Sequence, residues 1–246
     1  MTQAGGPALR VFHRKRKPLR NFIYVSDTKL DNLFEQIDPN LRRRISAEAK
    51  IDLKLASVTL GQKSPPQATR MAKLALVEHY IDKNHHVGTC STPGTGYFRG
   101  SIPMQWGWLN PHQGPDDDSK RDTVFFRGDS ESHSVILAGS RRHVLGERPA
   151  KENRDLVAGS AMPNIMAVIR ENLAPDPKFG VGRRNDERLL HEAMEIPLGG
   201  PAQHLEFLAM AIVQGTVGYE PVIHSVIIGT PIYVAMAEDH DAGEQT

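Results

Sequence analysis

Two segments of the chain repeat one pattern, an aromatic residue followed by Phe, Arg and Gly: Tyr97-Phe98-Arg99-Gly100 and Phe125-Phe126-Arg127-Gly128. Arginine suits an anion site because its planar guanidinium stays charged and binds phosphate or carboxylate through two hydrogen bonds. If the segments pair as neighbouring strands, Arg99 and Arg127 converge into a clamp, and each glycine lets a ligand approach. Alternatively, both arginines end strands in solvent while their aromatic neighbours fill the core.

A third basic segment follows an apolar run and reads Gly139-Ser-Arg-Arg-His143. The segment offers a hydroxyl, two guanidiniums and an imidazole directly after a strand, and this set favours binding of a phosphate. The backbone amides of a Gly-Ser turn would add hydrogen-bond donors. An aromatic ring would supply a stacking surface for a nucleotide-like ligand. The predicted ligand-binding residues are therefore Arg99, Arg127, Ser140, Arg141, Arg142, His143, Tyr97 and Trp106.

The same histidine supports a second hypothesis, a hydrolase or transferase. His143 would act as base with Ser140 or with a carboxylate such as Asp129. No Gly-x-Ser-x-Gly segment, the signature of one large class of serine hydrolases, occurs in the chain. The alternative is that His143 is a half-buried strand residue with one satisfied ring nitrogen.

A single cysteine, Cys90, excludes an internal disulfide framework and any multi-cysteine metal site. Its thiol would be reactive if exposed beside His85 or His86, whereas a buried lone cysteine is an inert small apolar residue. The spacing of the eleven histidines indicates no metal site, and the sequence does not identify a cofactor.

Charge and hydropathy exclude several kinds of protein. The 246 residues hold 30 Lys and Arg against 29 Asp and Glu, a net charge of +1, so no overall field draws the chain to nucleic acid or membrane. The longest apolar run, 205–213, is far shorter than the roughly 18 residues of a membrane helix. Residues 1–20 form a basic arm without a signal-peptide pattern, and residues 238–246 form an acidic tail.

Residues 21–237 are expected to form a single α+β domain, with helices packed on a mixed, largely antiparallel sheet. Alternation and β-branched runs predict strands, and Ser26 and Ser64 stand where helix caps belong. The predicted strands are 22–25, 51–60, 97–109, 123–127, 133–145 and 222–236. The predicted helices are 27–37, 65–81, 162–173, 187–195 and 202–213.

Four segments together resemble an uncharacterised family of actinobacterial proteins that opens with a Tyr-Ile-Ser-Asp-Thr-Lys type of segment. They read Phe22-Ile-Tyr-Val-Ser-Asp-Thr-Lys-Leu-Asp-Asn-Leu-Phe, Tyr97-Phe-Arg-Gly with Met104-Gln-Trp-Gly, Gly139-Ser-Arg-Arg-His-Val-Leu-Gly, and Ile228-Gly-Thr-Pro-Ile-Tyr-Val-Ala. The resemblance covers about residues 20–237 and implies a bacterial cytoplasmic protein, near signalling or defence systems. It implies no catalytic residue.

We therefore expect a ligand-binding or sensor module for a small anionic, nucleotide-like ligand. The alternatives are the enzyme built on His143 and a non-catalytic component that binds a protein partner through the basic arm and the C-terminal half. The basic arm would contact nucleic acid only through unspecific phosphate contacts, because no motif of a dedicated nucleic-acid reader is present.

Overall fold

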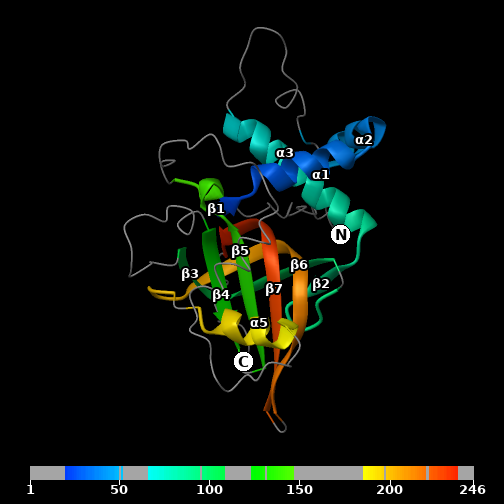
Figure 1. The fold of residues 1–246 in the computed structure, drawn as a ribbon. Helices are drawn as coiled ribbons and strands as arrows, with labels where there is room; N and C mark the ends of the chain where they lie inside the picture. Colours follow the sequence, from blue (N-terminus) through cyan, green and yellow to red (C-terminus); the bar gives the residue numbers. More distant parts are fainter. Residues whose placement is uncertain are drawn as a thin grey trace, which may run out of the picture.

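The computed structural model describes residues 20–49, 51, 66–94, 96–108, 123–130, 132–146, 185–196, 198–219 and 222–237. Figure 1 shows these elements along the chain. The strands are β1 (Asn21–Val25), β2 (Val87–Thr89), β3 (Tyr97–Trp108), β4 (Thr123–Asp129), β5 (His133–Ser140), β6 (Gln203–Tyr219) and β7 (Val222–Met236). The helices are α1 (Asp27–Gln36), α2 (Pro39–Ala49), α3 (Pro66–Asn84), α5 (Asn185–Met194) and a 3-10 turn, η3 (Arg141–His143).

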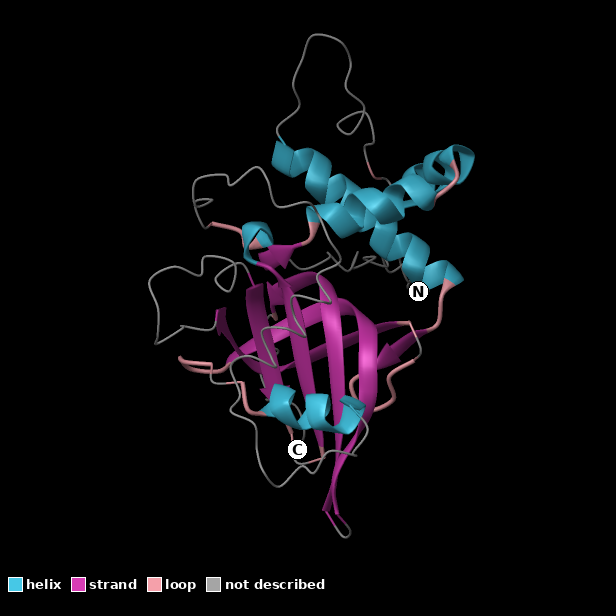
Figure 2. Ribbon diagram, viewed as in Figure 1, coloured by secondary structure: helices cyan, strands magenta, loops and turns pink. Residues whose placement is uncertain are grey.

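Five strands close into a barrel. The hydrogen-bonded ring runs β3, β4, β5, β7 and β6, and β6 pairs again with β3. β1 extends the sheet from β7 and β2 extends it from β3. The β2–β3 and β5–β7 pairs are parallel, and the other pairs are antiparallel. Figure 2 shows the strands curving around one interior.

The long strand β6 closes the ring. Its first part, residues 203–210, pairs with residues 97–104 of β3. Residues 205–219 pair on the other edge with the whole of β7. Because one segment forms ladders on both of its edges, the sheet has no open edge between β3 and β7.

The expected α+β fold, with helices packed on a mixed, largely antiparallel sheet, is therefore wrong: the fold is mostly β and the sheet closes into a barrel. The segment 202–213, predicted as a helix, is instead the first part of β6. Its side chains are buried on both faces, with Leu205 and Phe207 in the barrel interior and Leu208 against the helices. A strand buried on both faces shows a continuous apolar run, which cannot be told from a buried helix by periodicity.

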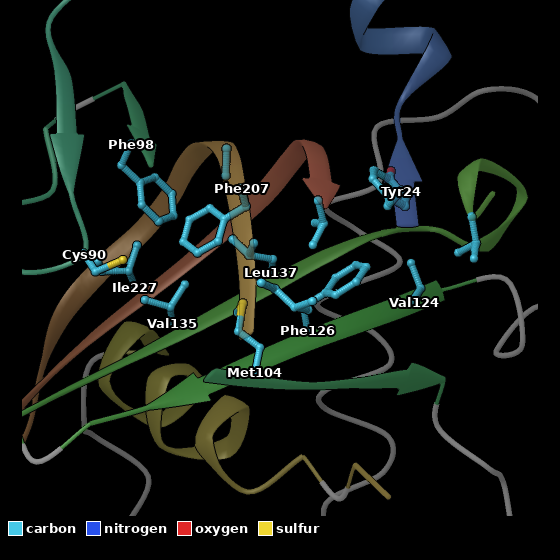
Figure 3. Close-up of a cluster of buried hydrophobic side chains, with 14 residues drawn as sticks. Tyr24, Cys90, Phe98, Met104, Val124, Phe126, Val135, Leu137, Phe207 and Ile227 are labelled. Atoms are coloured by element: carbon cyan, nitrogen blue, oxygen red, sulfur yellow. The ribbon is translucent and has the colours of Figure 1, made fainter. Parts of the chain in front are cut away.

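Three apolar clusters hold the elements together. The first fills the barrel and includes Phe98, Phe126 and Phe207, as Figure 3 shows. The second lies outside the barrel, where Leu189 and Leu190 of α5 cover the wall. The third joins α1, α2 and α3 to the outer face of β6, β7 and β1, so the three helices gather at one end of the barrel.

Several predicted elements are confirmed within a few residues: β1, α1, α3, β3, β4, α5 and β7. The strand predicted over 133–145 ends at Ser140, because the chain turns into η3. The predicted strand 51–60, apart from Ile51, and the predicted helix 162–173 lie outside the described residues, as do the acidic tail and the basic arm before Arg20. None of the helices in the described part of the chain combines the length and apolar composition needed to cross a membrane.

Candidate functional site

Backbone pairing brings the end of β5 next to the start of α1. After η3, Val144 forms an isolated antiparallel bridge with Tyr24 of β1. The amide of Leu145 donates to the carbonyl of Ile23 at 2.7 Å. These contacts place η3 beside the junction of β1 and α1, although more than a hundred residues separate them in the chain.

The first turn of α1 is held by Ser26. Its backbone amide donates to the carbonyl of Ile232 at 2.9 Å, and its hydroxyl accepts from the amide of Lys29 at 3.4 Å. Ile232 is the extra residue of a bulge in β7. Its neighbours Tyr233 and Pro231 pair with Leu208 and Ala209 of β6, which are adjacent, so Ile232 has no partner in the β6–β7 pairing. This bulge in the barrel wall therefore fixes where α1 begins.

Two side chains of η3 contact the hydroxyl of Thr28. The ring nitrogen Nε2 of His143 lies 3.4 Å from Thr28 Oγ1, and Arg142 Nη2 donates to the same oxygen at 3.2 Å. Arg142 Nε also lies 3.4 Å from His143 Nε2. Arg142 is exposed whereas His143 is buried, so the guanidinium covers the outer side of the imidazole.

The carboxylate of Asp27 is occupied by an arginine from another helix. Arg70 of α3 holds both of its oxygens, with Nε to Oδ1 at 2.6 Å and Nη2 to Oδ2 at 2.6 Å. His143 Nδ1 lies farther away, 3.8 Å from Asp27 Oδ2. A two-pronged arginine–carboxylate pair of this kind neutralises the acid and fixes its orientation.

Lys29 has no such partner. Its amine is half-buried and lies 3.5 Å from the hydroxyl of Ser26, and no carboxylate of the described residues contacts it. Burial lowers the pKa of Lys29 to about 8, because the charged form loses hydration.

His143 is a second group in this region whose pKa is shifted. Burial lowers its pKa to about 4, and the nearby charges of Arg142, Lys29 and Arg70 act in the same direction. The imidazole is therefore neutral at physiological pH. Its ring meets that of Tyr24 edge to face, with centroids 6.0 Å apart.

We call this group of seven residues the junction cluster. It brings together three cations, one carboxylate, two hydroxyls and a neutral imidazole, so positive charge exceeds negative charge. An anion is the ligand that such an arrangement attracts. The members are Ser26, Asp27, Thr28, Lys29, Arg70, Arg142 and His143.

The two predicted clamp arginines do not converge. In the β3–β4 register Arg127 lies opposite Gln105, six residues along β3 from Arg99, which is about 20 Å. Arg99 contacts Asp82 at the surface. Arg127 donates to the carbonyls of Met194 and Ile196 at 2.9 and 2.7 Å, where α5 ends.

The predicted stacking rings are also placed elsewhere. Trp106 packs against the barrel interior, parallel to Phe126 at 6.0 Å, and its Nε1 donates to Gln203 Oε1 at 2.9 Å. Tyr97 packs with the helical cluster and meets His85 edge to face at 5.2 Å. Neither ring contacts the junction cluster.

Of the four predicted residues at the end of β5 and in η3, the structure brings Arg142 and His143 into the cluster. The guanidinium of Arg141 instead lies 3.9 Å over the ring of Trp108. No hydrogen bond joins Ser140 to His143 in the described part of the chain. Asp129 lies at the opposite end of the β4–β5 pair and contacts Ser134, which in turn contacts His224.

Sequence reasoning missed residues 26–29 and Arg70 as site members. The Ser-Asp-Thr-Lys segment has polar and charged side chains that could mark a site, but its role as a helix cap was a sufficient explanation for them. Nothing local marks Arg70, since its role comes from the packing of α3 on α1. Among the described residues, no three His, Cys, Asp or Glu side chains group in a way that could hold a metal ion.

Residues 20–238 match a family described as a family of unknown function, DUF7019. The match spans most of the chain, and the protein belongs to this family. No curated protein and no solved structure matches the chain.

Proposed function

We propose that the junction cluster binds the anionic group, a phosphate or carboxylate, of a small ligand, and that the protein is a ligand-binding or sensor module. The observation that carries this proposal is the unmatched charge of Lys29 and Arg142. Asp27 is taken up by Arg70, and no other carboxylate contacts Lys29 or Arg142 in the described residues.

Energetics support an anion at this place. A half-buried ammonium without a counter-ion loses hydration and gains no ion pair in return. An anion between Lys29 and Arg142 would restore that pairing, and the hydroxyl of Thr28 would add a donor. Neutral His143 adds no charge, but its ring nitrogens can supply a hydrogen-bond donor or acceptor.

The proposal is narrower than the expectation from sequence. It uses Arg142 and His143 and leaves out Arg99, Arg127, Tyr97 and Trp106, because their side chains are engaged elsewhere. A nucleotide-like ligand remains part of the proposal only because its phosphate is an anion that the junction cluster could bind. The wider setting is also part of the proposal: a cytoplasmic protein of an actinobacterial family, in signalling or defence, with residues 26–29 as part of the family motif.

Native mass spectrometry on protein purified from its own cells tests whether a ligand is retained. Calorimetric titration, with inorganic phosphate and with acetate at low salt, then measures anion binding by protein from which any retained ligand has been removed. We expect one bound anion, and affinity at least tenfold lower in Arg142→Gln. Arg142 is exposed, so this variant should fold normally. Arg99→Gln is the matched control, because it also removes an arginine with a partly exposed side chain, and Arg99 lies outside the junction cluster.

Two results would contradict the proposal. One is a protein that retains no ligand and binds neither anion. The other is equal loss of affinity in Arg99→Gln and Arg142→Gln, which would indicate a general charge effect instead of a site.

A further inference from the structure

We propose that the amine of Lys29 is a nucleophile that condenses with the carbonyl group of a small anionic aldehyde or oxo acid to form an imine. The choice of an anionic substrate rests on the proposed function above, whereas the reactivity of the amine does not.

Lys29 differs from the other described lysines in its partners. Lys73 contacts Asp31 at 2.6 Å, and Lys83 contacts Glu48. Among the described residues, the Lys29 amine makes a hydrogen-bond contact with the hydroxyl of Ser26 alone, at 3.5 Å. An ion pair holds an amine in its protonated form, so Lys73 and Lys83 are poor nucleophiles and Lys29 is not restrained in this way.

Burial of the half-buried Lys29 amine favours its neutral form. Of the neighbouring titratable groups, Asp27 is paired with Arg70, and His143 is neutral and close enough for the charge of Lys29 to help lower the pKa of its imidazole. Burial in a site without a paired carboxylate is a known way of making a lysine nucleophilic near neutral pH. The lowered pKa, about 8, agrees with this geometry and leaves a substantial neutral fraction at pH 7.5.

The reaction is a balanced condensation. The amine nitrogen attacks the carbonyl carbon, and one amine hydrogen passes to the carbonyl oxygen, which becomes the hydroxyl of a carbinolamine. Loss of that hydroxyl with the remaining amine hydrogen as one water gives the imine. No group is oxidised or reduced, and no co-reactant is needed. Arg142 would hold the carboxylate of the substrate, so carbonyl compounds without an anionic group would bind more weakly.

Reductive trapping tests the proposal. The full chain is incubated with glyoxylate and sodium cyanoborohydride at pH 7.5, and peptide mapping follows carboxymethylation of each lysine. We expect Lys29 to be modified at least about tenfold faster than Lys73 and Lys83. Labelling of Lys29 should rise through about pH 8. Lys29→Arg should lose this modification and leave the other two unchanged, and Lys73→Arg is the matched control.

Acetaldehyde, which has no anionic group, separates the two proposals. Arg142→Gln should slow trapping of glyoxylate at Lys29 severalfold and leave trapping of acetaldehyde unchanged. Fast trapping of acetaldehyde with no advantage for glyoxylate would overturn the anionic substrate and the anion site, and would support the reactive amine. Equal labelling of Lys29, Lys73 and Lys83 by both aldehydes would overturn the nucleophile, even if phosphate binds.

Discussion

The imidazole nitrogen Nε2 of His143 lies 3.4 Å from the hydroxyl oxygen of Thr28, although 115 residues separate the two in the chain. This contact joins the turn after β5 to the first turn of α1. It also explains why His143 is buried, since α1 and the guanidinium of Arg142 cover it. The junction cluster is therefore a property of the closed fold, and its titration should report on folding.

The first prediction concerns stability and pH. The pKa of His143 is about 4 in the folded protein and about 6.5 when unfolded, so the unfolded state binds the extra proton between these values. The stability that the neutral ring contributes is complete above pH 6.5 and is lost as the pH falls towards 4. The loss should be about 3 kcal/mol, measured as the free energy of unfolding in urea.

His143→Gln should flatten this pH dependence, because glutamine does not titrate. His86→Gln, at an exposed position, serves as the control and should leave the curve unchanged. A His143→Gln protein that loses stability between pH 6.5 and 4 as steeply as the parent would show that other groups are responsible.

The second prediction concerns the packing of Tyr24 on β5. A Cβ at Gly139 would lie 2.3 Å from the Tyr24 hydroxyl oxygen and 2.7 Å from its ring carbon Cζ. Tyr24 is fully buried, so the ring has no free space to enter. Gly139→Ala should lower the free energy of unfolding by about 1–3 kcal/mol. Gly107→Ala, where no atom lies within 4 Å of the added Cβ, should be close to neutral.

The third prediction compares the two arginines of the repeated aromatic-Phe-Arg-Gly pattern. Arg127→Met removes two hydrogen bonds to the carbonyls that end α5 and an ion pair with Asp129 at 3.0 Å, and should cost about 2–3 kcal/mol. Arg99→Met removes one exposed contact with Asp82 and should cost about 0–1 kcal/mol. Chemical denaturation of both variants measures the difference, and equal costs would contradict a helix-anchoring role for Arg127.

The fourth prediction concerns Cys90. Its thiol is buried and donates to the carbonyl of Arg99 at 3.8 Å, and burial raises its pKa. A thiol reagent such as dithiobis-nitrobenzoate should therefore react only slowly with the native protein and rapidly after unfolding. Gly100→Ala, whose Cβ would lie 2.3 Å from Cys90 Sγ, should speed the native reaction by displacing the sulfur. Fast reaction of the unmodified native protein would contradict the burial.

The sequence by itself was sufficient for most local structure. Ser26 before an apolar helical repeat predicted the start of α1, and Ser64, Pro65 and Pro66 predicted α3. The β-branched and aromatic runs predicted β3, β4 and β7. These signals are local because a cap, a proline or an alternating face acts within a few residues.

Closure of the sheet was decided only by tertiary structure. The pairing of β6 with β3 joins segments about a hundred residues apart, whereas β7 follows β6 directly. Burial of β6 on both faces also hides the alternation that marks a strand. The same long-range register separates Arg99 from Arg127 and brings Lys29, Arg70 and His143 together. A site assembled by strand register leaves no short motif, because its members are neighbours in space and not in sequence.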